Sequence, residues 1–445
     1  MKLSEIAEIL HRPFEGNDAE FESISTDTRT LAPGQLFIAL SGPNFNANDF
    51  VVDAAQKGAA AAIVSQPLSV SIPTIKVDDT RIALAHLARH QREEANVPVI
   101  AVTGSCGKTT TRALLASVFG QMGQVLASEG SFNNDIGVPL TLLRLTSNHD
   151  YAIVEMGANH PGEIANLTEL VHPNVAIITN AGRAHLEGFG DLEGVACAKG
   201  EIFQGLSSDG VAIINNDDRY ADLWRNLVGS RRLVTFAIDH PADVMAIDIS
   251  LNEQSLPCFQ LRLPEHEVEI KLPLMGKHNV MNALAAAAAA YALDVPINSI
   301  KRGLETVAAV KRRLNEYKGY KGATIIDDSY NANPSSVAAA IDVLAKRPGD
   351  SVLVFGDMLE LGESADALHA EIGAIALQSG ITRLYCYGNH SRYAAKAFGE
   401  HGYHFENQES LLRALRDYLH KDATVLIKGS LGMKMNNITA ALIEE

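Results

Sequence analysis

The stretch Val97-Pro-Val-Ile-Ala-Val-Thr-Gly-Ser-Cys-Gly-Lys-Thr-Thr-Thr111 determines the expected fold. Its unbroken apolar run, residues 97–102, predicts a buried strand, and residues 109–119 have the apolar spacing of a helix. Between them, a glycine-bracketed turn is followed by a lysine and a threonine, which is the order found in phosphate-binding loops. The loop is shorter than the full motif, because Val102 stands where that motif has its first glycine.

This loop supplies the groups that hold a nucleotide phosphate. Backbone N–H groups at the start of a helix point toward an anion, and glycine lets the backbone approach it closely. Lys108 adds a positive charge, and the hydroxyl of Thr109 can reach a phosphate-bound Mg²⁺. We therefore expect the nucleotide to be bound by the loop residues Gly104, Ser105, Cys106, Gly107, Lys108, Thr109 and Thr110.

Cys106 allows two interpretations. It lies at the start of the predicted helix and two residues from Lys108, a setting that makes cysteines reactive. In the first interpretation, Cys106 is a reactive thiol that bound ATP shields. The alternative is a small residue that only fills a position in the loop.

Length and composition limit the class of protein. With 445 residues, 47% of them apolar, the chain is expected to form several domains. Its net charge of −16 and the lack of a basic stripe speak against a nucleic-acid partner. Four widely spaced cysteines predict neither a zinc site nor a disulfide framework. The charged N-terminus and the absence of a long apolar stretch predict a cytoplasmic protein without membrane insertion, and we expect a monomer.

Strands and helices alternate along most of the chain. In the middle, the apolar runs predict parallel strands that are covered on both faces, at 97–102, 124–128, 151–155, 174–179 and 210–215. Helices are expected between them, including 162–170 and 192–206. A helix at 80–93 precedes the first of these strands. The pattern predicts an α/β protein whose central, mostly parallel sheet is doubly wound, with ligands at the carboxyl ends of its strands.

Smaller α/β units are expected on either side of this sheet. The first has strands at 36–40 and 60–65 and a helix at 50–57; the last has strands at 324–327, 351–355, 382–386 and 423–427 and helices at 365–378 and 409–419. Short alternating runs within 244–272 predict antiparallel strands. An alanine-rich helix at 279–291 is expected to start with Asn279 as its N-cap. The predicted domains are 1–80, 81–312 and 313–445.

Three polar residues follow strands of the predicted central sheet and are expected to face the phosphate loop. Glu155 ends its strand and is a plausible Mg²⁺ ligand, since Mg²⁺ prefers carboxylate oxygens. On its own, His185 is better interpreted as a structural histidine, because imidazole suits Mg²⁺ poorly. On its own, Lys199 is better interpreted as part of a solvated helix face.

Taken together, the motifs resemble those of the ATP-dependent Mur ligases of bacterial cell-wall synthesis. The resemblance spans the whole chain and rests on Thr103–Thr110, Val154–Gly157, Asn180–His185, Ala198–Glu201, Gly276–Asn282 and Arg313. Within the family, further stretches are similar to those of members that add D-alanyl-D-alanine to UDP-N-acetylmuramoyl-tripeptide; these are Gly130–Pro139, Asp328–Pro334, Gly356–Gly362 and Lys428–Lys434.

The resemblance implies roles for residues that composition alone leaves unexplained. It implies that ATP is bound with the help of Asn279, Arg313 and Asp328, and that Mg²⁺ is held by Thr109, Glu155, His185 and Lys199. Lys199 would be carbamylated by CO₂, which turns a cation that Mg²⁺ repels into an anionic oxygen ligand. Lys108, Lys199, His185 and Glu155 are thus the expected catalytic residues.

The expected substrates are UDP-N-acetylmuramoyl-tripeptide and D-alanyl-D-alanine. The resemblance implies that the N-terminal domain holds the UDP end near Ser25, Thr26, Asp27 and Arg29. Asn133 and Asn134 are candidates for holding the peptide, and Asn331 and Asn333 for further substrate contacts. The stretch 44–50 departs from the acidic-Gly-His pattern of the family, so detailed uridine contacts are not predicted.

Particular residues speak against three alternative functions. The nearest is a sibling ligase that adds a single amino acid to the muramoyl precursor, or glutamate to folate; the Asp328–Pro334 motif argues against it. A regulatory GTPase needs an Asn-Lys-x-Asp guanine motif, which the sequence lacks. A structural domain with a relic phosphate loop is disfavoured by the intact Lys108, Thr109 and Glu155.

Overall fold

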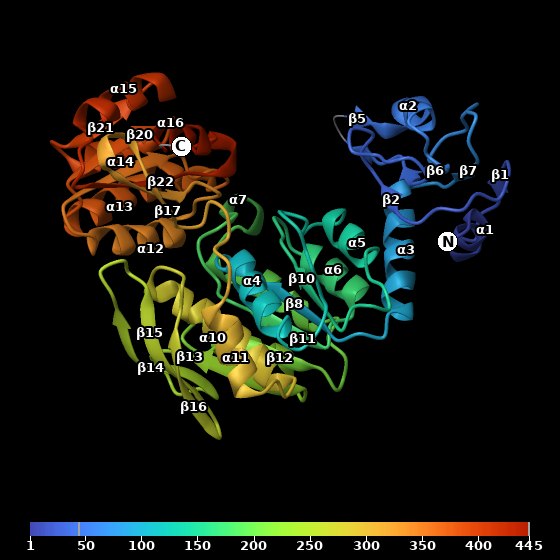
Figure 1. Ribbon diagram of the computed structural model, residues 1–445, viewed down its shortest axis with the longest axis horizontal. Coiled ribbons are helices and arrows are strands. Elements are labelled where there is room, and N and C mark those ends of the chain that lie inside the picture. Colours follow the sequence, from blue (N-terminus) through green and yellow to red (C-terminus); the bar gives the residue numbers. More distant parts are fainter. Residues whose placement is uncertain (43–44, 444–445) are drawn as a thin grey trace.

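The structure, a computed structural model, describes residues 1–42 and 45–443 and consists of three α/β domains (Figure 1). Each domain is built around its own sheet. Helix α3 (Thr80–Glu94) runs from the N-terminal domain to the central domain, and the C-terminal domain packs on the opposite side of the central domain. The predicted fold class is therefore confirmed. The boundaries 80/81 and 312/313 stay predictions.

The N-terminal domain is a small sheet of short strands. Its strand order is β1-β7-β6-β3-β2, and a separate hairpin is formed by β4 and β5. The elements are α1 (Leu3–Ile9), β1 (Phe14–Glu15), β2 (Ile24–Ser25), β3 (Leu36–Ile38), β4 (Ser41–Gly42), β5 (Phe45–Asn46), α2 (Val51–Gln56), β6 (Ala61–Val64) and β7 (Thr74–Lys76). The predicted strands at 36–40 and 60–65 correspond to β3 and β6. The four two-residue strands are too short to give a sequence pattern.

The central sheet has nine strands in the order β16-β15-β14-β13-β12-β11-β8-β10-β9. Its strands are β8 (Val99–Thr103), β9 (Val125–Ala127), β10 (Tyr151–Glu155), β11 (Val175–Ile178), β12 (Val211–Asn215), β13 (Arg232–Ala237), β14 (Val244–Leu251), β15 (Pro257–Leu263) and β16 (His266–Lys271). All neighbours from β9 to β14 are parallel, and β14, β15 and β16 pair antiparallel, as predicted. Every residue of β8 is buried.

Strand β8 lies at the switch point of this sheet. The chain goes from β8 to β9 and β10 on one side and then to β11 and β12 on the other. In such sheets a crevice opens at the carboxyl end of the strand where the direction reverses. The phosphate loop, which follows β8 directly, is therefore placed at the ligand-binding edge of the sheet.

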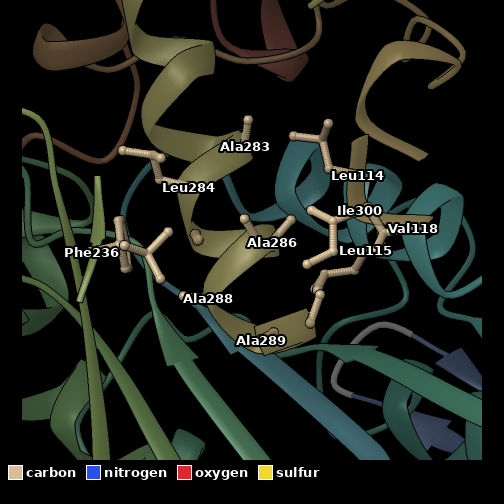
Figure 2. Packing of buried hydrophobic residues seen from close by; sticks show 14 of the residues in the cluster. Leu114, Leu115, Val118, Phe236, Ala283, Leu284, Ala286, Ala288, Ala289 and Ile300 are labelled. Atoms are coloured by element: carbon tan, nitrogen blue, oxygen red, sulfur yellow. The ribbon is translucent and has the colours of Figure 1, made fainter. Parts of the chain in front are cut away.

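Helices cover both faces of the central sheet. They are α4 (Lys108–Phe119), α5 (Gly137–Leu142), α6 (Glu163–Val171), α7 (Leu186–Phe189), α8 (Leu192–Gly200), α9 (Ala221–Val228), α10 (Lys277–Ala292) and α11 (Ile297–Glu305). Helix α10 is enclosed between α4 and the sheet: Figure 2 shows Leu284 directed toward Phe236 of β13 and Ala286 on the side of Leu115 of α4. The six alanines from Ala285 to Ala290 are completely buried, so the alanine run is explained by close packing.

Ala286 gives a test of this packing. We expect Ala286→Leu to destabilise the central domain by about 1–3 kcal/mol, because extra methyl groups in a filled core force side chains and backbone to shift. The check is a lower midpoint of thermal unfolding in scanning calorimetry. Ala440→Leu, on an exposed position of helix α16 (Asn436–Leu442), is the control and should leave the midpoint in place. An unchanged midpoint for Ala286→Leu would contradict the close packing of α10.

The C-terminal domain has a six-stranded sheet in the order β17-β18-β22-β19-β20-β21. Its elements are β17 (Asn315–Lys318), β18 (Thr324–Asp328), α12 (Pro334–Ala345), β19 (Asp350–Gly356), α13 (Ala365–Gln378), β20 (Arg383–Tyr387), α14 (Ser391–Phe398), β21 (Gly402–Phe405), α15 (Gln408–Tyr418), β22 (Ala423–Lys428) and α16. The four predicted strands are present. The two edge strands β17 and β21, which are only partly buried, have no apolar run and were not predicted.

One predicted helix start is wrong. The alanine-rich helix begins at Lys277 with Gly276 as its N-cap, so Asn279 lies in its first turn. Gly276 has a φ of +92°, which glycine adopts without strain. The side chain of Asn279 instead donates a hydrogen bond from Nδ2 to the carbonyl oxygen of Met275 (2.7 Å). The asparagine is thereby fixed inside the helix start, where its side chain borders the site described next.

Candidate active site

A large cavity lies where the central domain meets the C-terminal domain. Its volume is about 850 Å³. The predicted residues that line it are Ser105, Cys106, Gly107, Lys108, Thr109, Thr110, Asn133, Asn134, Glu155, His185, Asn279, Arg313, Asp328, Asn331 and Asn333. Among the described residues, its lining does not include Gly104, Lys199, Ser25, Thr26, Asp27 or Arg29. The fold thus brings most of the candidate residues to one place.

Two glycines allow the phosphate loop its shape. Gly104 has a φ of +148° and Gly107 a φ of +82°, which L-residues with a side chain rarely adopt. A Cβ atom at Gly104 would overlap Oγ1 of Thr179, and one at Gly107 would overlap Oδ1 of Asn282. Both positions therefore need glycine for two independent reasons, the backbone angle and the close approach of a neighbouring side chain.

Asn180 forms hydrogen bonds with the beginning of the phosphate loop. Its carbonyl oxygen accepts a hydrogen bond from the N–H of Ser105 (3.0 Å), and its Oδ1 accepts one from the N–H of Cys106 (2.9 Å). Asn180 Nδ2 in turn donates to the carbonyl oxygen of Cys106 (3.1 Å). These two loop amides are thus engaged within the protein. The amides of the first turn of α4, which lack helical acceptors, are the donors left to face an anion.

Gly107 provides a second test. We expect Gly107→Ala to weaken ATP binding about 10- to 100-fold, because the methyl group would displace Asn282 and move the first turn of α4. Isothermal titration with a non-hydrolysable ATP analogue measures the change. Gly380→Ala is a matched control, since Gly380 has a φ of +78° with nothing within 4 Å of the added Cβ. Gly380 lies outside the cavity, so this variant should keep the wild-type affinity; an unchanged affinity in Gly107→Ala would contradict the role given to the close approach of Asn282.

Glu155 is buried at the end of β10, beside the loop. Its Oε1 accepts hydrogen bonds from Asn133 Nδ2 (2.9 Å) and Thr109 Oγ1 (3.4 Å). Its Oε2 lies 3.2 Å from Nη1 of Arg112 but accepts no regular hydrogen bond among the described residues. A buried carboxylate oxygen without a hydrogen bond, next to a threonine hydroxyl, fits the oxygen-ligand set that Mg²⁺ prefers.

His185 contacts the C-terminal domain. Its Nδ1 lies 2.5 Å from Oε2 of Glu360, and the N–H of Glu187 in α7 donates to the carbonyl oxygen of Glu360 (3.5 Å). Both His185 (φ +53°) and Glu360 (φ +63°) have left-handed backbone angles, which are strained for residues other than glycine. Burial lowers the pKa of His185, and Glu360 opposes that shift. Strained residues of two domains therefore meet at the edge of the cavity.

Lys199 is buried, so its interpretation as part of a solvated helix face is wrong. Lys199 is 1% exposed, and its Nζ lies 5.0 Å from the ring centroid of Phe189. Burial, followed by the positive charge of Lys108, lowers the pKa of Lys199 to about 7. A substantial fraction of this amine is neutral at neutral pH, which is the form that reacts with CO₂. The residue lies behind the cavity wall, close enough for its charge to act on Lys108 and His185.

The cavity is also lined by Asn282, a residue that the sequence analysis did not select. Asn282 Nδ2 donates to Oδ1 of Asn279 (2.9 Å), so the two asparagines form a pair one turn apart on α10. The sequence signal for Asn282 is its spacing of three residues from Asn279, which puts both side chains on the same face of a helix. Nearby, the guanidinium of Arg313 lies 4.3 Å from the ring centroid of Tyr330, and its buried Nε has no hydrogen-bond partner among the described residues.

The C-terminal domain contributes a buried ion pair that was also missed. Lys428, at the end of β22, lies with Nζ 2.5 Å from Oδ2 of Asp328 and 2.9 Å from the carbonyl oxygen of Asn331. Lys428 thereby fixes the predicted loop that follows β18. Asn333 of the same loop reaches the phosphate loop, with Nδ2 3.2 Å from Sγ of Cys106. The thiol of Cys106 is therefore covered in part by the C-terminal domain.

The residues predicted to hold UDP lie apart from this cavity. Ser25 is buried, whereas Arg29 is exposed and pairs with Asp27 (2.7 Å). A second cavity, of about 360 Å³, is lined instead by Ser41, Gly42, Ser65, Asp78, Asp79, Thr80 and Arg81. Arg81 Nη1 lies 3.3 Å from Oδ2 of Asp135, so this cavity is linked to the loop that carries Asn133. Of the unusual stretch 44–50, Asn44 lies outside the described residues.

Comparisons with known proteins cover nearly the whole chain. Three family models match in order: "Mur ligase family, catalytic domain" at 20–103, "Mur ligase middle domain" at 102–290 and "Mur ligase, glutamate ligase domain" at 312–431. A relative from Escherichia coli K12 named UDP-N-acetylmuramoyl-tripeptide–D-alanyl-D-alanine ligase is 42% identical and covers 99% of this chain and 98% of its own. A relative of the same name from Bacillus subtilis is 38% identical over 95% of this chain and 93% of its own.

Solved structures agree with these relatives. MurF from Acinetobacter baumannii has a TM-score of 0.93 at 35% identity and covers 98% of this chain and 97% of its own. MurF from Thermotoga maritima, solved in complex with ADP, has a TM-score of 0.84 at 26% identity over 94% of this chain and 96% of its own. No helix among the described residues has the length and apolar character needed to cross a membrane. By sequence and by structure, the chain belongs to the Mur ligase family.

Proposed function

We propose that the protein is a cytoplasmic, monomeric ligase that uses ATP to join D-alanyl-D-alanine to UDP-N-acetylmuramoyl-tripeptide, forming ADP and phosphate. The observation that carries this proposal is the single cavity in which the phosphate loop, Glu155 and the loop at 328–334 meet. The names of full-length relatives at 38–42% identity support the choice of substrates. The ADP in the structure of a 26%-identical neighbour supports the nucleotide.

The first step brings two anions together. The carboxylate of the tripeptide attacks the γ-phosphorus of ATP, an acyl phosphate forms and ADP leaves. Lys108, Arg313 and the amides at the start of α4 offset the repulsion between carboxylate and triphosphate, so the protein acts mainly by positioning and electrostatics. Asn133 and Asn134 line the cavity on the side of Glu155, where they can orient the peptide.

The residues present fit a divalent cation. Glu155 and Thr109 would hold Mg²⁺, with His185 and a carbamylated Lys199 contributing directly or through water. Bound there, Mg²⁺ would supply positive charge that neutralises the phosphate oxygens. Lys199 is suited to carbamylation because it is buried and its pKa is lowered to about 7, so that its neutral amine can add to CO₂ with loss of one proton.

In the second step the amine of the dipeptide attacks the acyl carbon, and phosphate leaves from the tetrahedral intermediate. Water must be kept from the acyl phosphate for this to succeed. The C-terminal domain supplies that cover, and its contacts with the central domain include Asn333 with Cys106, Glu360 with His185, and Glu371 with Arg183 at 3.0 Å. These contacts place the cavity between the two domains.

The test is phosphate release by purified protein with ATP, Mg²⁺ and UDP-N-acetylmuramoyl-tripeptide. We expect release when D-alanyl-D-alanine is present and none when it is replaced by single amino acids. Release with a single amino acid, or with a folate and glutamate, would assign the protein to a sibling activity of the family. Folylpolyglutamate synthase from Mycobacterium tuberculosis, at 16% identity and a TM-score of 0.64, shares the fold only.

A further inference from the structure

Two leucines of the C-terminal domain line the cavity with their side chains open to it. Leu359 is 42% exposed and Leu431 is 50% exposed, and both line the cavity next to the polar residues Glu360 and Ser430. Gly432 lies beside them, and a Cβ atom there would come 3.0 Å from Cδ1 of Leu359. The two side chains and the glycine thus form a small apolar recess at the cavity wall.

The backbone around this recess is held firmly. The N–H of Leu359 donates to Oγ of Ser430 (2.9 Å), and the N–H of Ser430 donates to the carbonyl oxygen of Asp357 (3.0 Å). The N–H of Met358 donates to Nε2 of the buried His369 (2.9 Å). These hydrogen bonds tie the loop that carries Leu359 to Ser430, the residue before Leu431, so they hold the two leucines on neighbouring parts of the backbone.

The position of the recess determines which substrate it faces. The phosphate loop, α10 and Arg313 occupy the nucleotide side of the cavity, and Asn133 and Asn134 lie beside Glu155 on the central domain. The part of the C-terminal wall that carries Leu359 and Leu431 is assigned neither to ATP nor to the tripeptide, and it is left for the amine substrate. Leu359 precedes Glu360, which contacts His185 at the edge of the cavity, so the Cα atoms of Leu359 and Glu360 are about 3.8 Å apart.

We propose that Leu359 and Leu431 recognise the methyl group of the carboxyl-terminal alanine of the dipeptide. This inference rests on the proposed function. The amino end of the dipeptide must point to the acyl phosphate, so its carboxyl-terminal residue lies farther out, where the leucines are exposed. A methyl group is the apolar surface that such a recess can cover. Gly432 leaves the space that this methyl group needs.

The test compares D-alanyl-D-alanine with D-alanyl-glycine, which differ by this one methyl group. A methyl group in an apolar pocket changes kcat/KM by about 10- to 200-fold. We expect the wild-type protein to prefer D-alanyl-D-alanine by at least about 10-fold. In Leu359→Ala and Leu431→Ala this preference should fall to below about 3-fold, while KM for ATP stays within about 2-fold of wild type. In Gly432→Ala the rate with D-alanyl-D-alanine should fall more than the rate with D-alanyl-glycine.

Leu377→Ala is the matched control, because Leu377 is 52% exposed in the same domain but on α13, away from the cavity. It should keep the wild-type preference. An unchanged preference in both cavity variants, or an equal loss in Leu377→Ala, overturns the inference. Failure of the wild-type protein to use D-alanyl-D-alanine at all is a different result, since it removes the proposed function itself.

Discussion

Lys108→Met should reduce the ATP-dependent ligase rate at least about 10³-fold, the largest effect that we expect from one substitution. Lys108 is the lysine of the phosphate loop, and its Nζ donates to the carbonyl oxygen of Gly104 (2.5 Å). In this position the side chain is held within the loop that we propose to bind the triphosphate. Methionine keeps the length of the side chain but removes the positive charge that offsets the repulsion between the tripeptide carboxylate and the triphosphate. The measurement is ADP formation with both substrates present.

The control for Lys108→Met is Lys346→Met. Lys346 lies on the surface, where its Nζ pairs with Asp342 at 2.7 Å, so its loss should leave the rate within about 2-fold of wild type. Thermal unfolding of the Lys108 variant should match wild type, which separates loss of charge from loss of folding. A Lys108→Met rate within 10-fold of wild type would mean that the loop lysine does not act on the phosphates.

Lys199→Arg should lower the rate at least about 10²-fold, because arginine cannot form the carbamate and places a permanent charge behind the cation site. The pH dependence follows from the same residue. Only the neutral amine reacts with CO₂, and burial lowers the pKa of Lys199 to about 7. At a fixed low CO₂ concentration, the activity of the wild-type protein should therefore rise as the pH increases through about 7 and fall below it.

A spectroscopic measurement tests the carbamate apart from activity. With ¹³C-labelled bicarbonate, the wild-type protein should give a carbamate carbon signal in the NMR spectrum that is lost in Lys199→Arg. Lys301→Arg, at the surface of α11, should retain the signal and the rate. A wild-type protein without the signal, and with a rate that is insensitive to removal of CO₂, would contradict the role given to Lys199.

The structural features that depend on a few neighbouring residues could be predicted from the sequence. The apolar run before Gly104 identified β8, and the glycines, Lys108 and Thr109 identified the phosphate loop, because each of these features acts within a few residues. Continuous apolar strands likewise predicted the parallel sheet. The short and polar edge strands of the outer domains carry no such pattern, since only one of their sides is covered.

Residues whose surroundings come from distant segments were harder to interpret. The burial of Lys199 depends on Phe189 of α7 and on the fold of the central domain, which its own helix does not reveal. The sequence indicates Lys428 only as part of a motif. Its ion pair with Asp328 could not be predicted, because Asp328 lies on another strand that is distant in the sequence. The resemblance to a family supplied roles for both Lys199 and Asp328, and the structure supplies the contacts that explain their chemistry.

The central claim is that the tripeptide carboxylate is activated by ATP and then joined to D-alanyl-D-alanine. The most direct measurement uses UDP-N-acetylmuramoyl-tripeptide labelled with ¹⁸O in its terminal carboxylate, followed by mass spectrometry of both products. We predict a UDP-muramoyl-pentapeptide and one ¹⁸O atom transferred to the released phosphate, because the bridging oxygen of the acyl phosphate leaves with phosphorus. Pentapeptide formed with unlabelled phosphate, or ATP turnover without pentapeptide, would contradict the account.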